Sequence, residues 1–442
     1  MISELKIRNF KSLESVDLKL GHFNLLVGAN ASGKSNFLDA LRFLQGIGNG
    51  LSIAEILDGR PQTSTSVKWD GIRGGSRFVA FRRKDGSPAE TVELGGSIPE
   101  TILYGIERSD LGFELKLTPE TGRFEQRMGI TPDRPGYLQC YLPYGESIES
   151  FRSKGLAEGF HSTSLNEGIL YRAMASAFDT AARDHSNRLK QRDEGLIAEE
   201  VGHLNSPTRE SLDPSPEWVD AAHIFDALRD MQPIDPYPDN LRGYSGSPSR
   251  SQMGEHGEGF AALIHEIESN GSKPALLEWL KELRPDEVCD IYALEGLNND
   301  FMVAIKEGNK EFRGPVLSEG TLRFIALAAA FFQPSMPKIL VIEEIEKGLH
   351  PSRLRLLLEL MRSQSKRTGT QVFATTHSPT LLNWLTEEDR KTTFVCTRDA
   401  ESGATKMRSL AEVPRLEELI QKNYNLDQLF EEGWLESALH ES

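Results

Sequence analysis

The sequence predicts an α/β fold: a mostly parallel sheet, an antiparallel β subdomain and a mainly helical insertion. Three observations support it. An apolar run at residues 23–27 leads into a glycine-rich loop and then into apolar residues at helical spacing. A second apolar run, 339–342, has the continuous character of a strand buried on both faces of a parallel sheet. Between about 66 and 128, short apolar segments separated by Gly, Asp and Pro are typical of an antiparallel meander.

The N-terminal part begins with two strand-like segments within residues 2–20 and continues into a loop that matches the pattern G-x-x-x-x-G-K-[ST] in full. The strand at 23–27 enters this loop, and a helical pattern at 36–44 follows it. This strand, loop and helix order is the context that a phosphate-binding loop requires, and a Gly/Ser turn that matches by chance is the alternative. The matching residues are Gly28, Ala29, Asn30, Ala31, Ser32, Gly33, Lys34 and Ser35.

The chemistry of a phosphate chain explains these residue types. Several negative charges need backbone N–H donors, a helix N-terminus and a mobile cation. Gly28 and Gly33 let the backbone curl around the β-phosphate, and Lys34 can reach the β and γ oxygens. The Ser35 hydroxyl is placed to ligate Mg²⁺. With Asn36 at the start of the following helix, the loop predicts a bound nucleoside triphosphate.

Two acidic residues, Glu343 and Glu344, follow the apolar strand at 339–342. Sheets of α/β proteins place their ligands at the carboxyl ends of the strands. We interpret Glu343 as the metal-side carboxylate and Glu344 as the group that polarises the attacking water. The alternative is an acidic strand end that faces solvent.

Two further segments complete the candidate site. His377 follows a predicted strand at 371–375 and is expected to sense the γ-phosphate, although a lone histidine is more often an ordinary surface or core residue. Ser318 opens an apolar helix that continues through 332. With a carboxylate in the first turn and Gly320 behind it, this start is a good helix N-terminus and a candidate anion site, and capping alone would also explain Ser318.

Composition narrows the class of protein. The chain has 442 residues, enough for two or three domains. Its three cysteines are far apart and suggest neither a disulfide framework nor a zinc site. No signal-peptide or membrane-spanning run is present, so we expect a soluble, cytoplasmic protein with no membrane partner. The net charge of -16 argues against a surface that is basic throughout, although a local basic stripe remains compatible with it.

The order of patterns predicts four parts. They are an N-terminal lobe at 1–130, a mainly helical insertion with linkers at 131–290, a C-terminal lobe at 291–400 and a helical tail at 401–442. Residues 207–216 and 233–251 are rich in Pro, Ser and Gly and are predicted as loops. The second of these stretches, together with the adjoining 254–259, is either disordered or a loop that contacts a nucleotide or a second copy. The apolar face of the tail at 426–439 is expected to pack in the core rather than bind a partner.

Taken together, the motifs resemble those of ABC-type ATPases of the SMC, RecF and OLD-like branch, including bacterial AAA family ATPases of type 21. In this resemblance IRNFKS (7–12) is the opening strand, GANASGKS the Walker A motif, and LSEGTLR (317–323) a degenerate LSGGQ signature. LVIEE is the Walker B motif, GLHP the D-loop and TTHSP the H-loop. These motifs cover about the first 40 residues and 315–385.

The resemblance implies a head-to-tail ATP sandwich with Mg²⁺. Ser318 and Gly320 of one chain would contact the γ-phosphate of the ATP that Lys34 of the other chain holds. The active form is then a homodimer or a higher homo-oligomer with composite sites. Long coiled-coil arms are absent between the two motif halves, and only 65 residues follow His377, which is too short for a Toprim nuclease domain.

The sequence also departs from the family pattern. Walker B normally ends in Asp-Glu, and here it ends in Glu343 and Glu344. The signature carries Glu319 where Gly is common and Thr321 where Gln is common, and no glutamine can be assigned to the Q-loop. These differences bear on the metal side of the site and on the contact between chains.

Three hypotheses of function follow. The first is an ATPase switch in anti-phage defence that acts beside a separately encoded effector, a nuclease or a toxin. The second is a RecF-like repair ATPase whose ATP-closed dimer clamps duplex DNA. The third keeps ATP as a structural ligand without turnover.

Overall fold

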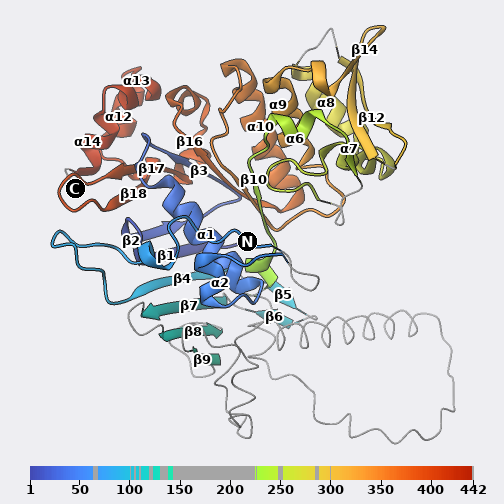
Figure 1. Ribbon diagram of the computed structural model, residues 1–442. Coiled ribbons are helices and arrows are strands. Elements are labelled where there is room, and N and C mark those ends of the chain that lie inside the picture. The colour runs from blue at the N-terminus through green and yellow to red at the C-terminus, as the bar shows by residue number, and fades with distance from the viewer. Residues whose placement is uncertain are drawn as a thin grey trace, which may run out of the picture. The chain divides into compact units, whose positions relative to one another are not determined.

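The structure is a computed structural model that describes residues 1–62, 68–99, 101–103, 106–108, 111–118, 123–129, 138–142, 224, 226–246, 252–283, 288–298 and 300–440 (Figure 1). It divides into two compact units. The first contains Met1–Ala40, Phe81–Pro88 and Asp230–Ser442, and the second contains Leu41–Ala80 and Ala89–Arg229. The four-part division drawn from the sequence stays a prediction.

A six-stranded sheet organises the first unit. Five of its strands are parallel, and the edge strand β18 runs antiparallel to β17. Every residue of β3, β15 and β16 is buried, as expected for strands covered on both faces. This confirms the predicted mostly parallel sheet. In spatial order its strands are β10 (Met231–Ile234), β15 (Ile339–Ile342), β16 (Gln371–Thr376), β3 (Phe23–Val27), β17 (Thr393–Arg398) and β18 (Thr405–Ser409).

Three helices begin within or directly after the motif segments: α1 (Lys34–Gly48), α9 (Glu319–Ala329) and α10 (Pro351–Thr368). All residues of α9 after Glu319 are buried, because a helix that is apolar on every side must lie inside a core. The predicted end of α10 is confirmed, since Gly369 caps it in the left-handed conformation.

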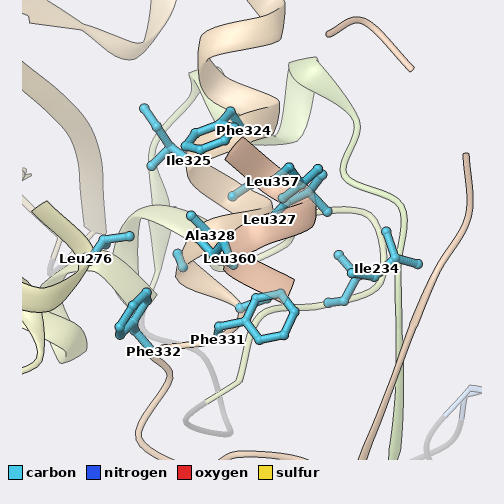
Figure 2. Close-up of a cluster of buried hydrophobic side chains, with 14 of the residues drawn as sticks. Ile234, Leu276, Phe324, Ile325, Leu327, Ala328, Phe331, Phe332, Leu357 and Leu360 are labelled. Carbon is cyan, nitrogen blue, oxygen red and sulfur yellow. The ribbon is translucent and has the colours of Figure 1, made fainter. Parts of the chain in front are cut away.

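The core of this unit lies where α9 and α10 pack with α7 (Phe260–Ser269) and α8 (Lys273–Leu283). Because α7 and α8 pack against α9 and α10, the N-termini of α9 and α10 are held in place, and the loops that precede α9 and α10 end at fixed positions. Figure 2 shows side chains of this cluster, among them Ile234, Leu276, Phe324, Leu327, Phe331, Phe332, Leu357 and Leu360.

The prediction of a loop over 233–251 is partly wrong. This stretch contains the end of β10, the short helix α6 (Pro238–Arg242) and the two-residue strand β11 (Ser245–Gly246). Proline is compatible with the first turn of a helix, where its missing N–H is not needed. Strand β11 pairs with β13 in a second, antiparallel sheet made of β11, β12 (Val288–Glu295), β13 (Asp300–Glu307) and β14 (Lys310–Arg313).

The first unit also contains the N-terminal hairpin and the C-terminal helices. Strands β1 (Glu4–Phe10) and β2 (Leu13–Lys19) pair antiparallel, as predicted. The tail forms three helices rather than two, because Gly433 adopts a positive φ of 71° and interrupts the predicted helix at 426–439. Its apolar face packs into a core cluster, as expected. The helices are α12 (Leu416–Gln421), α13 (Leu426–Glu431) and α14 (Trp434–His440).

The second unit contains the predicted antiparallel meander. It is formed by β4 (Val92–Ile98), β7 (Leu111–Thr118), β8 (Arg123–Gly129) and β9 (Leu138–Leu142), with a small β5 (Thr101–Leu103) and β6 (Ile106–Arg108) hairpin. Residues 78–81 are among the short apolar segments that the sequence predicts as strands of this meander, and this prediction is wrong, since a 3-10 turn occupies Ser76–Phe78. Most of the predicted helical insertion lies outside the described residues. No helix of the described ranges is long and apolar enough to cross a membrane.

Candidate functional site: a phosphate loop at the carboxyl edge of the parallel sheet

The predicted site residues gather at one edge of the parallel sheet. Val27, the last residue of β3, pairs with Thr376 of β16, and Ile342, the last residue of β15, pairs with Ala374. The phosphate loop, the two acids and His377 therefore leave their strands at the same edge. This is where α/β sheets bind ligands.

Close packing leaves room only for glycine at two positions of the phosphate loop. Gly33 has a φ of 105°, and a Cβ there would collide with the Thr405 side chain. A Cβ at Gly28 would collide with the carbonyl of Cys396. The loop is thus pressed against β17 and β18 and has no room for side chains at these two positions.

Lys34 is folded back on its own loop. Its Nζ donates to the carbonyl oxygens of Gly28 and Ala29 at 2.6 and 2.9 Å. Burial lowers the pKa of Lys34, and the nearby carboxylates of Glu346, Glu344 and Glu343 act in the opposite direction. The ammonium is thus held among the acids of the site before any phosphate is present.

The cysteine beside this lysine is not a nucleophile. Burial raises the pKa of the Cys396 thiol to about 12, so it carries no thiolate at neutral pH. Cys396 forms no disulfide, and the side chain of Cys140 lies outside the described set.

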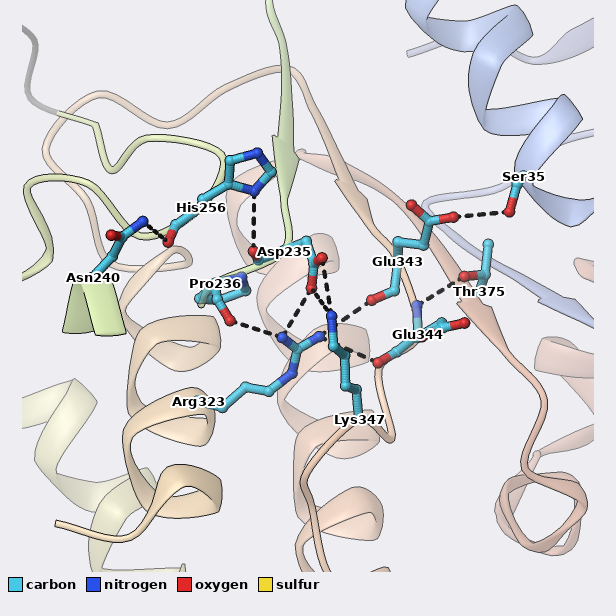
Figure 3. A network of polar contacts seen from close by, with 10 residues as sticks. All are labelled: Ser35, Asp235, Pro236, Asn240, His256, Arg323, Glu343, Glu344, Lys347 and Thr375. Carbon is cyan, nitrogen blue, oxygen red and sulfur yellow. Dashed lines mark hydrogen bonds and ion pairs between the residues drawn. The ribbon is translucent and has the colours of Figure 1, made fainter. Parts of the chain in front are cut away.

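Ser35 and Glu343 meet directly. The Ser35 hydroxyl donates to Glu343 Oε1 at 2.9 Å, which brings together two residues 308 positions apart in the chain (Figure 3). A hydroxyl and a carboxylate are oxygen ligands of the kind that Mg²⁺ takes alongside phosphate oxygens and water. The described part of the chain contains no group of three or more His, Cys, Asp or Glu side chains that could hold a metal ion by themselves.

The loop also carries a buried polar atom without a partner. Ser32 is 4% exposed, and within the described residues its Oγ has no hydrogen bond. A buried hydroxyl without a partner is costly unless a ligand supplies one. This atom fits a phosphate oxygen.

Glu344 has a strained backbone. Its φ of 49° places a non-glycine residue in the left-handed region, which costs about 1–3 kcal/mol and is frequent at active sites. Its N–H donates to Thr375 Oγ1 at 2.9 Å, and the next N–H, of Ile345, donates to the Thr375 carbonyl at 3.1 Å. The turn after β15 is therefore fixed against β16, so the Glu344 side chain starts from a defined position.

Arg323, in the second turn of α9, supports the same turn through its guanidinium (Figure 3). Its guanidinium is 1% exposed and donates to Asp235 Oδ1 and the Pro236 carbonyl, both at 2.9 Å. It also reaches the carbonyls of Glu343 and Glu344 at 3.3 Å. Sequence reasoning quoted Arg323 only within a motif and missed Asp235. The available signal was an arginine inside an apolar helix, which needs a buried partner.

Replacing Arg323 by Met is expected to destabilise the protein by about 1–3 kcal/mol, because the Asp235 carboxylate keeps only Lys347 as a charged partner and the carbonyls of Glu343 and Glu344 lose a donor. Urea unfolding measures the effect. The matched control is Arg355→Met, since Arg355 is in an exposed i,i+4 pair with Glu359 that contributes about 0.3–0.5 kcal/mol. Equal losses in the two variants would contradict the bracing role.

Ser318 and Gly320 occupy different environments. The Ser318 side chain caps α9, accepting from the Thr321 N–H at 3.2 Å, and the residue is exposed. Gly320 is buried, and a Cβ there would lie 2.5 Å from the carbonyl oxygen of Gly348 in the GLHP segment. The need for glycine at 320 is therefore explained within one chain.

Asn36 and His377 each have a partner that sequence reasoning missed. The Asn36 amide donates to Ser12 Oγ at 2.6 Å, which ties the start of α1 to the turn after β1. Nearby, Lys11 and Asp39 form a buried ion pair. His377 contacts Glu346, which lies two residues after Glu344, the second of the predicted acids.

The fold and this site define a P-loop ATPase of the SMC and RecF-like class, with ABC-type motifs. The chain belongs to the family described as "AAA domain, putative AbiEii toxin, Type IV TA system", whose model matches residues 160–383. A second model, "AAA ATPase domain", matches residues 1–55. This membership agrees with the resemblance drawn from the motifs and favours ATP hydrolysis over a purely structural nucleotide.

Individual relatives agree with this class. An "ATP/GTP phosphatase" of Helicobacter pylori is 22% identical over 402 residues, which is 89% of this chain and 90% of that protein. The "DNA replication and repair protein RecF" of Porphyromonas gingivalis is 29% identical over 180 residues, 37% of this chain and 48% of RecF. An SMC head solved in complex with the C-winged helix domain of ScpA shares the fold, with a TM-score of 0.50 at 14% identity, over 95% of this chain and 99% of that structure.

Proposed function

We propose that this ATPase is a cytoplasmic, Mg²⁺-dependent switch in which two copies close head to tail on ATP. The position of Ser318 carries the proposal, because it caps the exposed N-terminus of an 11-residue helix. Such a terminus favours an anion. The γ-phosphate of the ATP that Lys34 of a second copy holds is the anion that this surface would meet, and a symmetric pair would complete two sites.

Within one chain, each group has a defined task. Residues 28–36 bind the triphosphate, and Lys34 exchanges its loop carbonyls for phosphate oxygens. Ser35 and Glu343 would hold Mg²⁺, which supplies charge neutralisation on the β and γ oxygens when bound. Glu344 orients and polarises the attacking water, and His377 contacts the terminal phosphate. Glu343 is one methylene longer than the usual aspartate, and its hydrogen bond to Ser35 supports its place on the metal side.

For the biological role we favour anti-phage defence with a separately encoded nuclease or toxin as effector. The family description, which names a putative toxin of a Type IV TA system, supports this role. The similarity to an ATP/GTP phosphatase over most of the chain supports turnover of the nucleotide as its chemistry.

A RecF-like repair ATPase is the second candidate, supported by the 29% identity to RecF over 180 residues. The net charge of -16 speaks against it, because DNA binding relies on Lys and Arg contacts to phosphates. Both roles share the ATP-closed dimer and differ in what it binds.

Duplex DNA binding separates the two roles. For the defence role we expect ATP hydrolysis with a duplex affinity that is low and does not change when ATP is added. A RecF-like clamp predicts the opposite: ATP-dependent binding that weakens by about 10³–10⁵ between 50 and 200 mM salt. Fluorescence anisotropy of a labelled duplex, with and without ATP at both salt concentrations, gives the answer. Lys34→Ala serves as the control for nucleotide dependence.

A further inference from the structure

One carboxylate of the site has no role in the chemistry described so far. Glu346 Oε1 accepts a hydrogen bond from the His377 backbone N–H at 2.6 Å, and Nδ1 of the His377 ring lies 2.7 Å from the same oxygen. The Glu346 side chain is 9% exposed, whereas that of His377 is 46% exposed. The histidine is thus accessible on one side and attached to a buried acid on the other.

The turn that carries Glu346 is rigid. The Ile345 N–H donates to the Thr375 carbonyl, and the Leu349 N–H donates to the Glu346 carbonyl at 2.9 Å. Both residues of the pair are therefore attached to β16. Glu346 is attached through the hydrogen bonds of its turn, and His377 directly follows the last residue of the strand. A carboxylate held in this way fixes the ring by geometry rather than by charge alone.

The same carboxylate acts electrostatically on Lys34 of the phosphate loop. Among the three acids that oppose the lowered pKa of Lys34, Glu346 has a larger effect than Glu344 or Glu343. Its second oxygen, Oε2, is buried and has no hydrogen-bond partner among the described residues. A buried carboxylate oxygen without a partner costs more than a surface ion pair contributes, so stability alone does not account for this acid.

We propose that Glu346 is a positioning residue that holds His377 with Nδ1 protonated, so that Nε2 is the nitrogen presented to the terminal phosphate. A ring nitrogen that donates to a carboxylate fixes the tautomer and the orientation of the other nitrogen. This inference rests on the proposed role of His377 and adds a residue to it. Glu346 itself touches neither phosphate nor water in this role.

Steady-state kinetics test the proposal. Glu346→Ala is expected to lower kcat by about 10- to 100-fold with KM for ATP nearly unchanged, as when the partner of a functional histidine is removed. In a His377→Ala chain, adding Glu346→Ala should change kcat by less than about twofold, because the partner it acts through is already missing. Glu359→Gln, an exposed acid on α10, is the control. An equal loss of kcat in both backgrounds would overturn the proposal.

A spectroscopic readout keeps the proposal independent of turnover. Long-range ¹H–¹⁵N spectra of the ¹⁵N-histidine-labelled chain should show His377 with its proton on Nδ1, and Glu346→Gln or Glu346→Ala should shift or mix this pattern. The Gln variant keeps the shape if the Ala variant fails to fold. Absence of ATP hydrolysis in the unaltered chain would contradict the proposed function and leave the spectra to decide on Glu346. A ring proton on Nε2 alone, or a pattern that Glu346→Gln leaves unchanged, would overturn the inference.

Discussion

Replacing Lys34 by Ala is expected to lower ATP turnover by at least about 10²–10³-fold, the usual effect of removing one preorganised charged donor. The structure holds the Lys34 ammonium desolvated against the carbonyls of Gly28 and Ala29 and close to three acids. Moving it onto a phosphate oxygen replaces one set of oxygen acceptors by another, so little reorganisation opposes it. Phosphate release and ATP binding should both be measured, because the lysine contacts the bound triphosphate as well as the transition state.

The matched control is Lys366→Ala. Lys366 is exposed on α10 and pairs with Glu388, so its loss should leave turnover within about twofold, as expected for a surface ion pair. Unchanged turnover in Lys34→Ala would contradict the assignment of residues 28–35 as the phosphate site.

Glu344→Gln is expected to lower kcat by about 10²–10⁴-fold, the range for loss of a general base, with ATP affinity preserved. Glutamine keeps the size of the side chain, and the backbone bond from the Glu344 N–H to Thr375 does not depend on the carboxylate. Bound ATP should therefore persist in this variant. Nucleotide that stays with the protein through gel filtration would report it.

The neighbouring Glu343→Gln is the sharpest comparison. Glu343 accepts from Ser35, so its loss should raise the Mg²⁺ concentration needed for half-maximal activity. Glu344→Gln should leave that concentration unchanged. If the two substitutions changed the same parameter, the division of roles between the two acids would be wrong.

The parallel sheet could be predicted from the sequence because its central strands are short apolar runs with clear boundaries. Residues 23–27 and 339–342 are strands over those limits. The segments that were mispredicted are short elements whose conformation depends on distant partners. Strand β11 has two residues and exists through pairing with β13, and the segment after Gly74 and Gly75, both with positive φ, turns instead of extending.

In the candidate site too, residues within local motifs could be predicted, whereas their distant partners could not. Local motifs selected Lys34, Ser35, Glu343, Glu344 and His377, which follow strands that end at the same edge of the sheet. The partners that hold the site in place could not be predicted from the sequence, because they are far apart along the chain. Arg323 lies 88 residues from Asp235, and His377 lies 31 residues from Glu346. A single sequence carries no sign of such pairings except for a charge placed among apolar residues. Arg323 was such a charge.

In the proposed switch, Ser318 of one chain contacts the ATP that another chain holds. The mass of the Glu344→Gln chain in solution tests this arrangement most directly. Light scattering should give one chain of 49.3 kDa without nucleotide and about twice that mass with ATP and Mg²⁺. Adding Ser318→Arg, which places a bulky side chain at the exposed start of α9, should return the mass to that of one chain while ATP stays bound. An ATP-loaded Glu344→Gln chain that remains at 49.3 kDa, or a Ser318→Arg variant that still doubles its mass, would contradict the account.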